Sequence, residues 1–239
     1  MSDILITVII MERYNIITEK FPREIVLLKS KPCSYGKCAF CDYIDDNSNN
    51  LIEINQTNQE VLSNVKGVYD ILEVINSGNI FDLPKSSLAL VKDTVDSHKF
   101  RKLFAEAHWI FRHHLPKMRN RLDVDIMFKT GVETFDYDFR EKVLKKGAPF
   151  QTIDELKKYF DSPCIMVGVK GQTKEMIKRD IDIVLNHFNH ATVNIYCENT
   201  TPIKPDPTLK EWFYTEYKWL DEVKHLEVLW NNTDFGVGD

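Results

Sequence analysis

The sequence predicts an α/β protein in which six strand–helix units form a partial (β/α)6 barrel of the TIM type. Two observations support this. Short apolar runs alternate with longer amphipathic stretches between residues 24 and 197, and polar clusters follow the apolar runs. Alternating strands and helices form parallel sheets with the helices outside. Six units are too few to close an eight-stranded barrel, and active sites in such barrels gather at the carboxyl ends of the strands.

The first strand is expected at residues 24–29, an apolar run bounded by prolines, as for a strand buried on both faces. The helix after it is expected at residues 57–65, because Thr57 and Glu60 have the spacing of a capping box. A second strand is expected at residues 70–75. It ends at a turn of small polar residues.

The next helix is expected to begin between Pro84 and Ser87, which places Leu88, Val91 and Val95 on one face. The remaining units continue the alternation. Their expected strands are 103–107, 123–130, 164–168 and 191–197, and their expected helices are one ending at Arg119 and those at 136–146, 152–160 and 173–188.

The C-terminal residues 198–239 are expected to be a short extension of a single domain, 1–239, whose core covers about residues 24–197. No low-complexity linker or fixed-period repeat divides the chain. The extension is rich in aromatic residues, which predict a packed helix and a final strand that closes the barrel mouth. They are Trp212, Phe213, Tyr214, Tyr217, Trp219 and Trp230.

The composition narrows the class of protein. The chain has 239 residues, and its 43% of hydrophobic residues suits one soluble globular domain with a sizeable core. Residues 4–11 are apolar but lack the flanking features of a signal peptide, so we expect no membrane span and a cytoplasmic protein with reduced cysteines. The net charge of −5 favours a small-molecule substrate and makes a nucleic-acid partner unlikely.

Three cysteines lie on the stretch that follows the first strand. Four residues separate Cys33 from Cys38, and two separate Cys38 from Cys41. A structural zinc ion normally has four protein ligands, and a disulfide between the last two would leave Cys33 unexplained. An iron–sulfur cluster bound by three thiolates fits the motif best. A zinc-stabilised, non-catalytic binding module is the alternative from a different class.

This motif resembles the CxxxCxxC signature of the radical S-adenosylmethionine (SAM) superfamily, in which an aromatic residue precedes the last cysteine, as Phe40 does here. The chain departs from the signature by one extra residue, and Gly36 gives the loop freedom to absorb it. The resemblance implies a 4Fe-4S cluster held by the three cysteines, SAM on the open iron, a 5′-deoxyadenosyl radical, and flavodoxin or ferredoxin as the electron donor. The other two cysteines, Cys164 and Cys197, are expected to be buried core thiols.

The resemblance also implies where SAM binds. The turn after the second expected strand would contact the amino group of SAM. A polar residue after the third expected strand would also reach SAM, and the end of the fourth expected strand would contact its ribose. A lysine beside Gly147 would pair with its carboxylate. With two aromatic residues of the cysteine loop, the cofactor-binding residues implied are Phe40, Tyr43, Ser77, Gly78, Asn79, Glu106, Glu133 and Lys146.

The substrate is indicated by a closer resemblance. The strings 22–29, 32–43 and 106–109, together with Arg112, resemble a small group of bacterial radical SAM proteins that salvage queuine. This implies a lyase that cleaves the carbon–nitrogen bond of this 7-deazaguanine base and releases 7-aminomethyl-7-deazaguanine (preQ1). Another small molecule or a tRNA base is the alternative. The residues expected at the substrate are Asp42, His108, Arg112, Asn194 and Tyr196, with Glu198 and Asp234 as further carboxylates; each also has a structural reading, in the core, on a helix start or at the surface.

Overall fold

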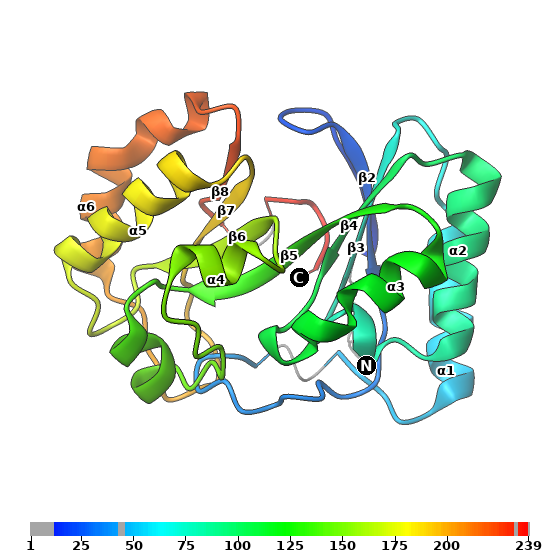
Figure 1. The fold of residues 1–239 in the computed structure, drawn as a ribbon, viewed down its shortest axis with the longest axis horizontal. Helices are drawn as coiled ribbons and strands as arrows, with labels where there is room; N and C mark the ends of the chain where they lie inside the picture. Colours follow the sequence, from blue (N-terminus) through cyan, green and yellow to red (C-terminus); the bar gives the residue numbers. More distant parts are fainter. Residues whose placement is uncertain (1–11, 43–45, 232–233, 239) are drawn as a thin grey trace, which may run out of the picture.

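The computed structural model describes residues 12–42, 46–231 and 234–238, which form one curved sheet of eight strands in sequential order (Figure 1). Strands β2 to β8 pair in parallel, and β1 pairs antiparallel with β2 at one edge. The partial α/β barrel is confirmed. The strands are β1 Tyr14–Ile17, β2 Arg23–Leu28, β3 Ile71–Asn76, β4 Lys102–Glu106, β5 Asp125–Glu133, β6 Ser162–Val167, β7 Ala191–Ile195 and β8 Leu226–Leu229.

The helices cover the outer, convex face of this sheet, with α1 to α3 on one side and α4 to α6 on the other (Figure 1). Apolar side chains of the strands pack outward against them in two clusters, one under α1 to α3 and one under α5 and α6. The helices are α1 Leu51–Ser63, α2 Lys85–His98, α3 Leu115–Leu122, α4 Ile153–Lys157, α5 Lys174–His187 and α6 Pro207–Tyr217, with shorter turns η2 Ile80–Asp82, η3 Trp109–His114, η4 Phe139–Val143 and η5 Lys218–Glu222.

Helix α1 begins six residues before the expected start. Asn50, not Thr57, is its N-cap, and the Asn50 side chain accepts hydrogen bonds from the amides of Ile52 and Glu53 at 3.0 and 3.4 Å. Asn58, inside the helix, is buried and bonds the backbone of Lys29 at the end of β2. The capping-box prediction was therefore wrong, because a stronger cap stands upstream and a buried polar contact fixes the helix interior.

The segment after β5 is also less helical than expected. A five-residue π-helix, η4, and the short α4 stand where two longer helices were predicted. The buried Arg140 side chain explains the difference, because it donates hydrogen bonds to the carbonyls of Thr134, Ala148 and Phe150 and so folds the chain around its guanidinium group.

The C-terminal extension supplies the expected packed helix, α6, and final strand, β8. β8 pairs with β7 and extends the sheet at its edge, so it does not cover the barrel mouth as predicted. In the part of the chain that the structure describes, no helix has the length and apolar character needed to cross a bilayer. The apolar residues 4–11 and Tyr43 lie outside the described residues.

The concave side of the sheet carries a buried ion network at the amino-terminal end of its strands. Arg23 of β2 pairs with Glu73 of β3 and, at 2.7 Å, with Glu227 of β8, while Lys129 of β5 donates to Glu73 at 2.7 Å. The Phe235 ring lies 5.0 Å from the Arg23 guanidinium carbon and 5.1 Å from the Lys129 ammonium. This network, hereafter the barrel floor, links β2 to β8 across the open side of the sheet.

Candidate active site

The cysteine loop leaves β2 and runs along one end of the sheet, at the lower edge of Figure 1. Several hydrogen bonds fix it. The Ala39 amide donates to the Leu144 carbonyl at 2.9 Å, and the Phe40 carbonyl accepts from the Asn199 amide group at 2.8 Å and the Tyr196 hydroxyl at 3.2 Å. The Phe40 side chain is buried against Phe139, Met166 and Tyr196. The loop is thus held by the chain itself at the carboxyl ends of the parallel strands.

The three thiols of this loop are partly exposed. Burial raises the pKa of Cys38, the Lys146 ammonium lowers it, and Glu133, Cys41 and Cys33 raise it, with a net value of about 12. Among the described residues, no group of three His, Cys, Asp or Glu side chains could hold a metal ion. The fit to a cluster therefore rests on the donor set, three soft thiolate ligands on one short loop, the ligand type that iron–sulfur clusters take.

A buried ion pair stands at the end of β5. The Lys146 ammonium donates to Glu133 at 2.7 Å, and both side chains are nearly inaccessible to solvent. Although burial lowers the pKa of Lys146, Glu133 and Cys38 raise it above its usual value, so the ammonium is charged. Glu133 adopts a φ of 65° at a break in the β5–β6 register, which directs its carboxylate toward Gly131, where a Cβ atom would collide with both partners.

His108 links the end of β4 to the same turn. Its Nδ1 accepts from the Ile110 amide at 3.3 Å, so Nε2 carries the proton and donates to the Lys146 carbonyl at 2.8 Å. Burial and the nearby Lys146 ammonium together lower the pKa of His108 to about 4, although its hydrogen bond to the Lys146 backbone acts in the opposite direction. The neutral ring is therefore an anchor for the backbone of Lys146, in addition to capping η3.

The polar turn after β3 lies against the cysteine loop. A Cβ atom on Gly78 would lie 3.4 Å from the Cys33 Cα and would collide with Asp82, so the close approach needs glycine. Ser77 donates to the Asp46 carbonyl at 2.9 Å. Asn79 is buried and caps η2 by accepting from the Phe81 amide at 3.1 Å. The turn is next to the cysteines, as predicted, but its side chains make internal bonds.

Most residues expected at the substrate make other contacts. Asp42 accepts from the Thr200 amide at 2.9 Å, and Arg112 stacks on Trp109 with its guanidinium carbon 4.8 Å from the ring centroid. The Tyr196 hydroxyl bonds the carbonyls of Phe40 and Ile203, both at 3.2 Å. Two outer carboxylates lie in surface contacts: Glu198 pairs with Lys204, and Asp234 accepts from Asn231.

Asn194 differs from these. It lies on β7, and its Oδ1 atom is buried without a hydrogen-bond partner among the described residues. Thr192, two residues earlier on the same strand, likewise has a buried hydroxyl without a partner there. Side chains two apart on a strand share a face, so Thr192, Asn194 and Tyr196 line the concave side together. Sequence reasoning missed Thr192, although the period of two could have found it.

Cys164 of β6 is the register partner of Thr192 on β7 and lies on the same concave side. It is buried, as predicted, and burial raises the pKa of its thiol to about 12, with Lys129 lowering it and Glu106 and Glu133 raising it. Burial also raises the pKa of Glu106, which stands at the end of β4. Cys197 is half-buried, not buried as expected, because it follows the end of β7, where the chain turns toward the surface.

Comparison with known proteins shows which proteins have a similar sequence and fold. No family model matches the chain. A solved structure of queuine lyase from Clostridium spiroforme, bound to SAM and queuine, superposes with a TM-score of 0.94 and 47% identity over 96% of this chain and 100% of that chain. An uncharacterized protein of Methanocaldococcus jannaschii is 26% identical over 139 residues, which is 51% of this chain and 38% of the length of that relative.

Two further solved structures share the fold alone. SuiB from Streptococcus suis superposes with a TM-score of 0.54 at 17% identity, covering 86% of this chain and 48% of that one. Methylornithine synthase gives a TM-score of 0.58 at 14% identity, covering 88% of this chain and 64% of that one.

The curled parallel half-barrel with a three-cysteine loop after its first parallel strand, together with the match to a queuine lyase bound to SAM, identifies a radical SAM enzyme. The predicted class is confirmed. With 47% identity over nearly its whole length, the chain belongs to the family of the queuine lyase from Clostridium spiroforme.

Proposed function

We propose that this chain is a queuine lyase. It would use a 4Fe-4S cluster and SAM to cleave the carbon–nitrogen bond between queuine's cyclopentenediol and its aminomethyl group, releasing 7-aminomethyl-7-deazaguanine. The observation that carries the proposal is the match of the whole fold to a queuine lyase that was solved with SAM and queuine bound, at a TM-score of 0.94. The same proposal includes a cytoplasmic location, where the cysteines stay reduced.

Cys33, Cys38 and Cys41 would hold three irons of the cluster and leave one open for SAM. When bound, the cluster and SAM supply the 5′-deoxyadenosyl radical chemistry that removes a hydrogen atom from the substrate. Lys146 presents a buried positive charge that matches the carboxylate of SAM, and Glu133 beside it presents acceptors for the ribose hydroxyls. The chain thus supplies charge and orientation around the cofactor.

Queuine would lie on the concave surface between the cysteine loop and the barrel floor. The Asn194 Oδ1 atom and the Thr192 hydroxyl are buried and have no partner among the described residues, so a polar ligand that bonds them would remove a desolvation cost. An N–H group of a deazaguanine suits the Asn194 oxygen. Glu106, at the end of β4, is kept as the polar residue that would reach SAM.

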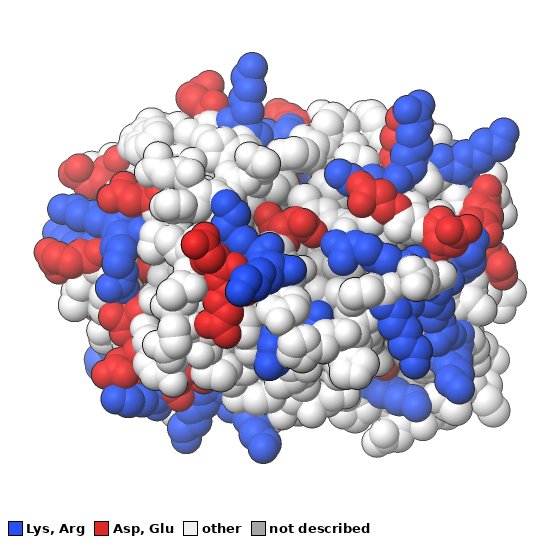
Figure 2. All heavy atoms as spheres, viewed as in Figure 1, with Lys and Arg blue, Asp and Glu red and all other residues white. Residues whose placement is uncertain are grey.

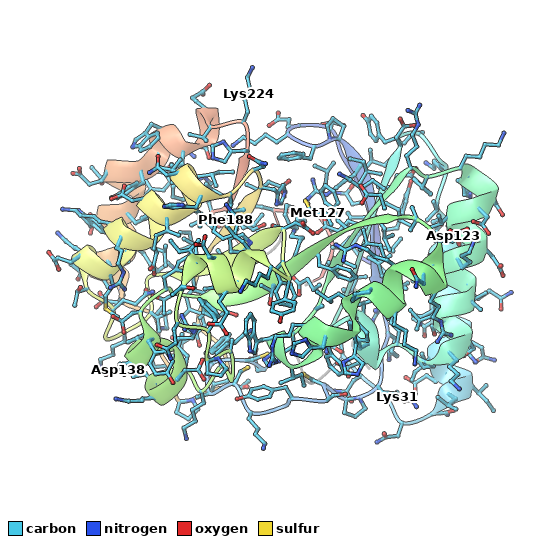
Figure 3. The ribbon with its side chains drawn as sticks, in the orientation of Figure 1. Lys31, Asp123, Met127, Asp138, Phe188 and Lys224 are labelled. Carbon is cyan, nitrogen blue, oxygen red and sulfur yellow. The ribbon has the colours of Figure 1, made fainter. Side chains whose placement is uncertain are left out.

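We also propose a protein partner. Exposed lysines flank the cysteine loop, among them Lys31, which Figure 3 labels at the lower edge of the molecule, and Lys37 and Lys145. They favour an acidic one-electron carrier, flavodoxin or ferredoxin, at the side from which the cluster is reached. Over the face in Figure 2, acidic and basic side chains are interspersed, with basic ones gathering over α3.

Anaerobic reconstitution with iron and sulfide tests the proposal. The reconstituted protein should be brown with broad visible absorption. With SAM, dithionite and queuine it should form 5′-deoxyadenosine and 7-aminomethyl-7-deazaguanine, both followed by mass spectrometry. Formation of 5′-deoxyadenosine without the deazaguanine product would assign another substrate. A protein that takes up zinc and no iron would instead favour the binding module.

A further inference from the structure

Tyr35 lies in the stretch by which the cysteine motif departs from the common spacing. Ser34, Tyr35, Gly36 and Lys37 separate the first two cysteines, one more residue than the CxxxCxxC signature has. The Ser34 amide donates to Asp82 at 3.1 Å, so the start of the stretch is tied to η2. Gly36 adopts a φ of 57°, a left-handed conformation that glycine reaches at low cost. Tyr35 lies between these two fixed points.

The Tyr35 side chain contacts two other elements of the site. Its ring stacks on His108 with centroids 4.3 Å apart and planes 19° apart, and its hydroxyl donates to the Lys145 carbonyl at 2.7 Å. Gly147 adopts a φ of 64°, and a Cβ atom there would collide with the Tyr35 ring. A glycine is therefore needed where the ring lies against the turn at residues 145–147.

The same turn carries the predicted SAM ligand. His108, under the Tyr35 ring, donates to the Lys146 carbonyl at 2.8 Å, and the Lys146 ammonium reaches Glu133 at 2.7 Å. The Tyr35 hydroxyl and the His108 ring thus bind consecutive carbonyls, those of the two peptide units that flank Lys146. The contacts of Tyr35 and His108 therefore connect the cysteine loop to the Glu133–Lys146 pair.

We propose that Tyr35 is a positioning residue that sets the distance between the cluster-binding loop and the Glu133–Lys146 pair. SAM would bind both at once, because the open iron takes its amino and carboxylate groups while the pair takes its carboxylate and ribose. A loop displaced from the pair would weaken SAM binding without unfolding the chain. The inference rests on the radical SAM assignment and does not depend on the identity of the substrate.

Three variants test this. Tyr35→Leu removes the stack and the hydrogen bond, and Tyr35→Phe removes the hydrogen bond alone. Tyr217→Leu is the control, because Tyr217 forms a stack of the same kind with Phe213 at 4.8 Å on α6, outside the site. Each reconstituted protein is assayed for iron content, for SAM affinity by calorimetry, and for the change that SAM causes in the electron paramagnetic resonance spectrum of the dithionite-reduced cluster.

SAM affinity should fall about tenfold in Tyr35→Leu, the loss expected for one aromatic stack with its hydrogen bond. In Tyr35→Phe it should fall about threefold. The spectral change on adding SAM should be weakened in Tyr35→Leu, and Tyr217→Leu should match the wild type in affinity and spectrum. Should Tyr35→Leu fail to fold, Tyr35→Phe decides. Wild-type SAM affinity and spectrum in the folded Tyr35 variants would overturn the proposal, and since no measurement uses queuine, this failure is distinct from failure of the lyase assignment.

Discussion

Individual polar side chains around the site fall into two groups, those whose polar atoms are paired within the chain and those whose atoms are not. Asp42 and Tyr196 belong to the first group, because their oxygens bond neighbouring loops. Asn194 and Thr192 belong to the second. Residue type alone did not separate these groups. The sequence could place a polar residue at a strand end, but it could not reveal which of its atoms are hydrogen-bonded to a neighbouring loop.

Asn194 provides the first test of the substrate assignment. Asn194→Ala removes the buried oxygen, so KM for queuine should rise about fivefold, the effect of one hydrogen bond, with little change in kcat. The measurement is steady-state release of 7-aminomethyl-7-deazaguanine. The control is 5′-deoxyadenosine formation in the absence of queuine, which should match that of the wild type. An unchanged KM would remove Asn194 from the substrate site.

Lys146 and Glu133 provide a test of the SAM site that separates binding from stability. Lys146→Met leaves the Glu133 carboxylate buried without its partner, so the free energy of unfolding should fall by about 3 kcal/mol and SAM binding should be lost. The double variant Lys146→Met/Glu133→Gln removes the unpaired charge. It should regain most of the stability, measured by urea unfolding, yet still fail to bind SAM in calorimetry. Recovery of SAM binding would contradict the assigned role.

At the scale of elements, the strands were predicted better than the segments between them. The expected strands overlap β2 to β7, because buried parallel strands are short apolar runs that stand out in a sequence. Helix α1 was misplaced at its start because two caps compete there, and only the packing of Asn58 under β2 decides between them. β1 was missed because its four residues are only half-buried at a sheet edge.

The link between β2 and β8 in the barrel floor predicts an acid-sensitive element. Burial alone would raise the pKa of Glu227, but the His190 hydrogen bond and the charges of Lys129 and Arg23 lower it to about 2 from its usual 4.5. A lowered folded-state pKa means that this carboxylate stabilises the protein above pH 4.5 and that its contribution is lost as the pH falls toward 2.

Glu227→Gln should therefore destabilise the protein by about 3 kcal/mol at pH 7 and by clearly less at pH 3, where the wild type has lost part of the same contribution. Guanidinium unfolding at the two pH values measures both differences. Glu222→Gln, an exposed neighbour on η5, is the matched control and should leave stability within about 0.5 kcal/mol of the wild type. An equal loss for Glu227→Gln at both pH values would show that the charge is not the source.

For the whole molecule, the alternation of elements was enough to predict an open parallel barrel with its site at the carboxyl ends of the strands. Contacts between residues that are far apart in the sequence were not predictable. Arg23 and Glu227 are more than two hundred positions apart, and no local pattern indicates that they pair. The same holds for Asn199 and Phe40, whose hydrogen bond joins the segment after β7 to the cysteine loop.

The hydrogen bonds that hold the cysteine loop lead to a prediction about the protein without its cluster. The cysteine loop is held at Ser34 by Asp82, at Ala39 by Leu144 and at Phe40 by Tyr196 and Asn199, so its course does not depend on metal. Chelation should therefore lower Tm by a few degrees while unfolding stays cooperative, unlike small zinc modules, which are unfolded without their metal.

Calorimetry of the reconstituted and the chelated protein under anaerobic conditions measures the difference. A triple variant, Cys33→Ser, Cys38→Ser and Cys41→Ser, is the control. It cannot hold a cluster, so its Tm should match that of the chelated wild type whether or not iron and sulfide were supplied. Loss of the cooperative transition on chelation, with the same loss in the triple variant, would contradict this prediction. It would mean that the metal centre is required for folding, and that the cysteine loop is primarily a folding element.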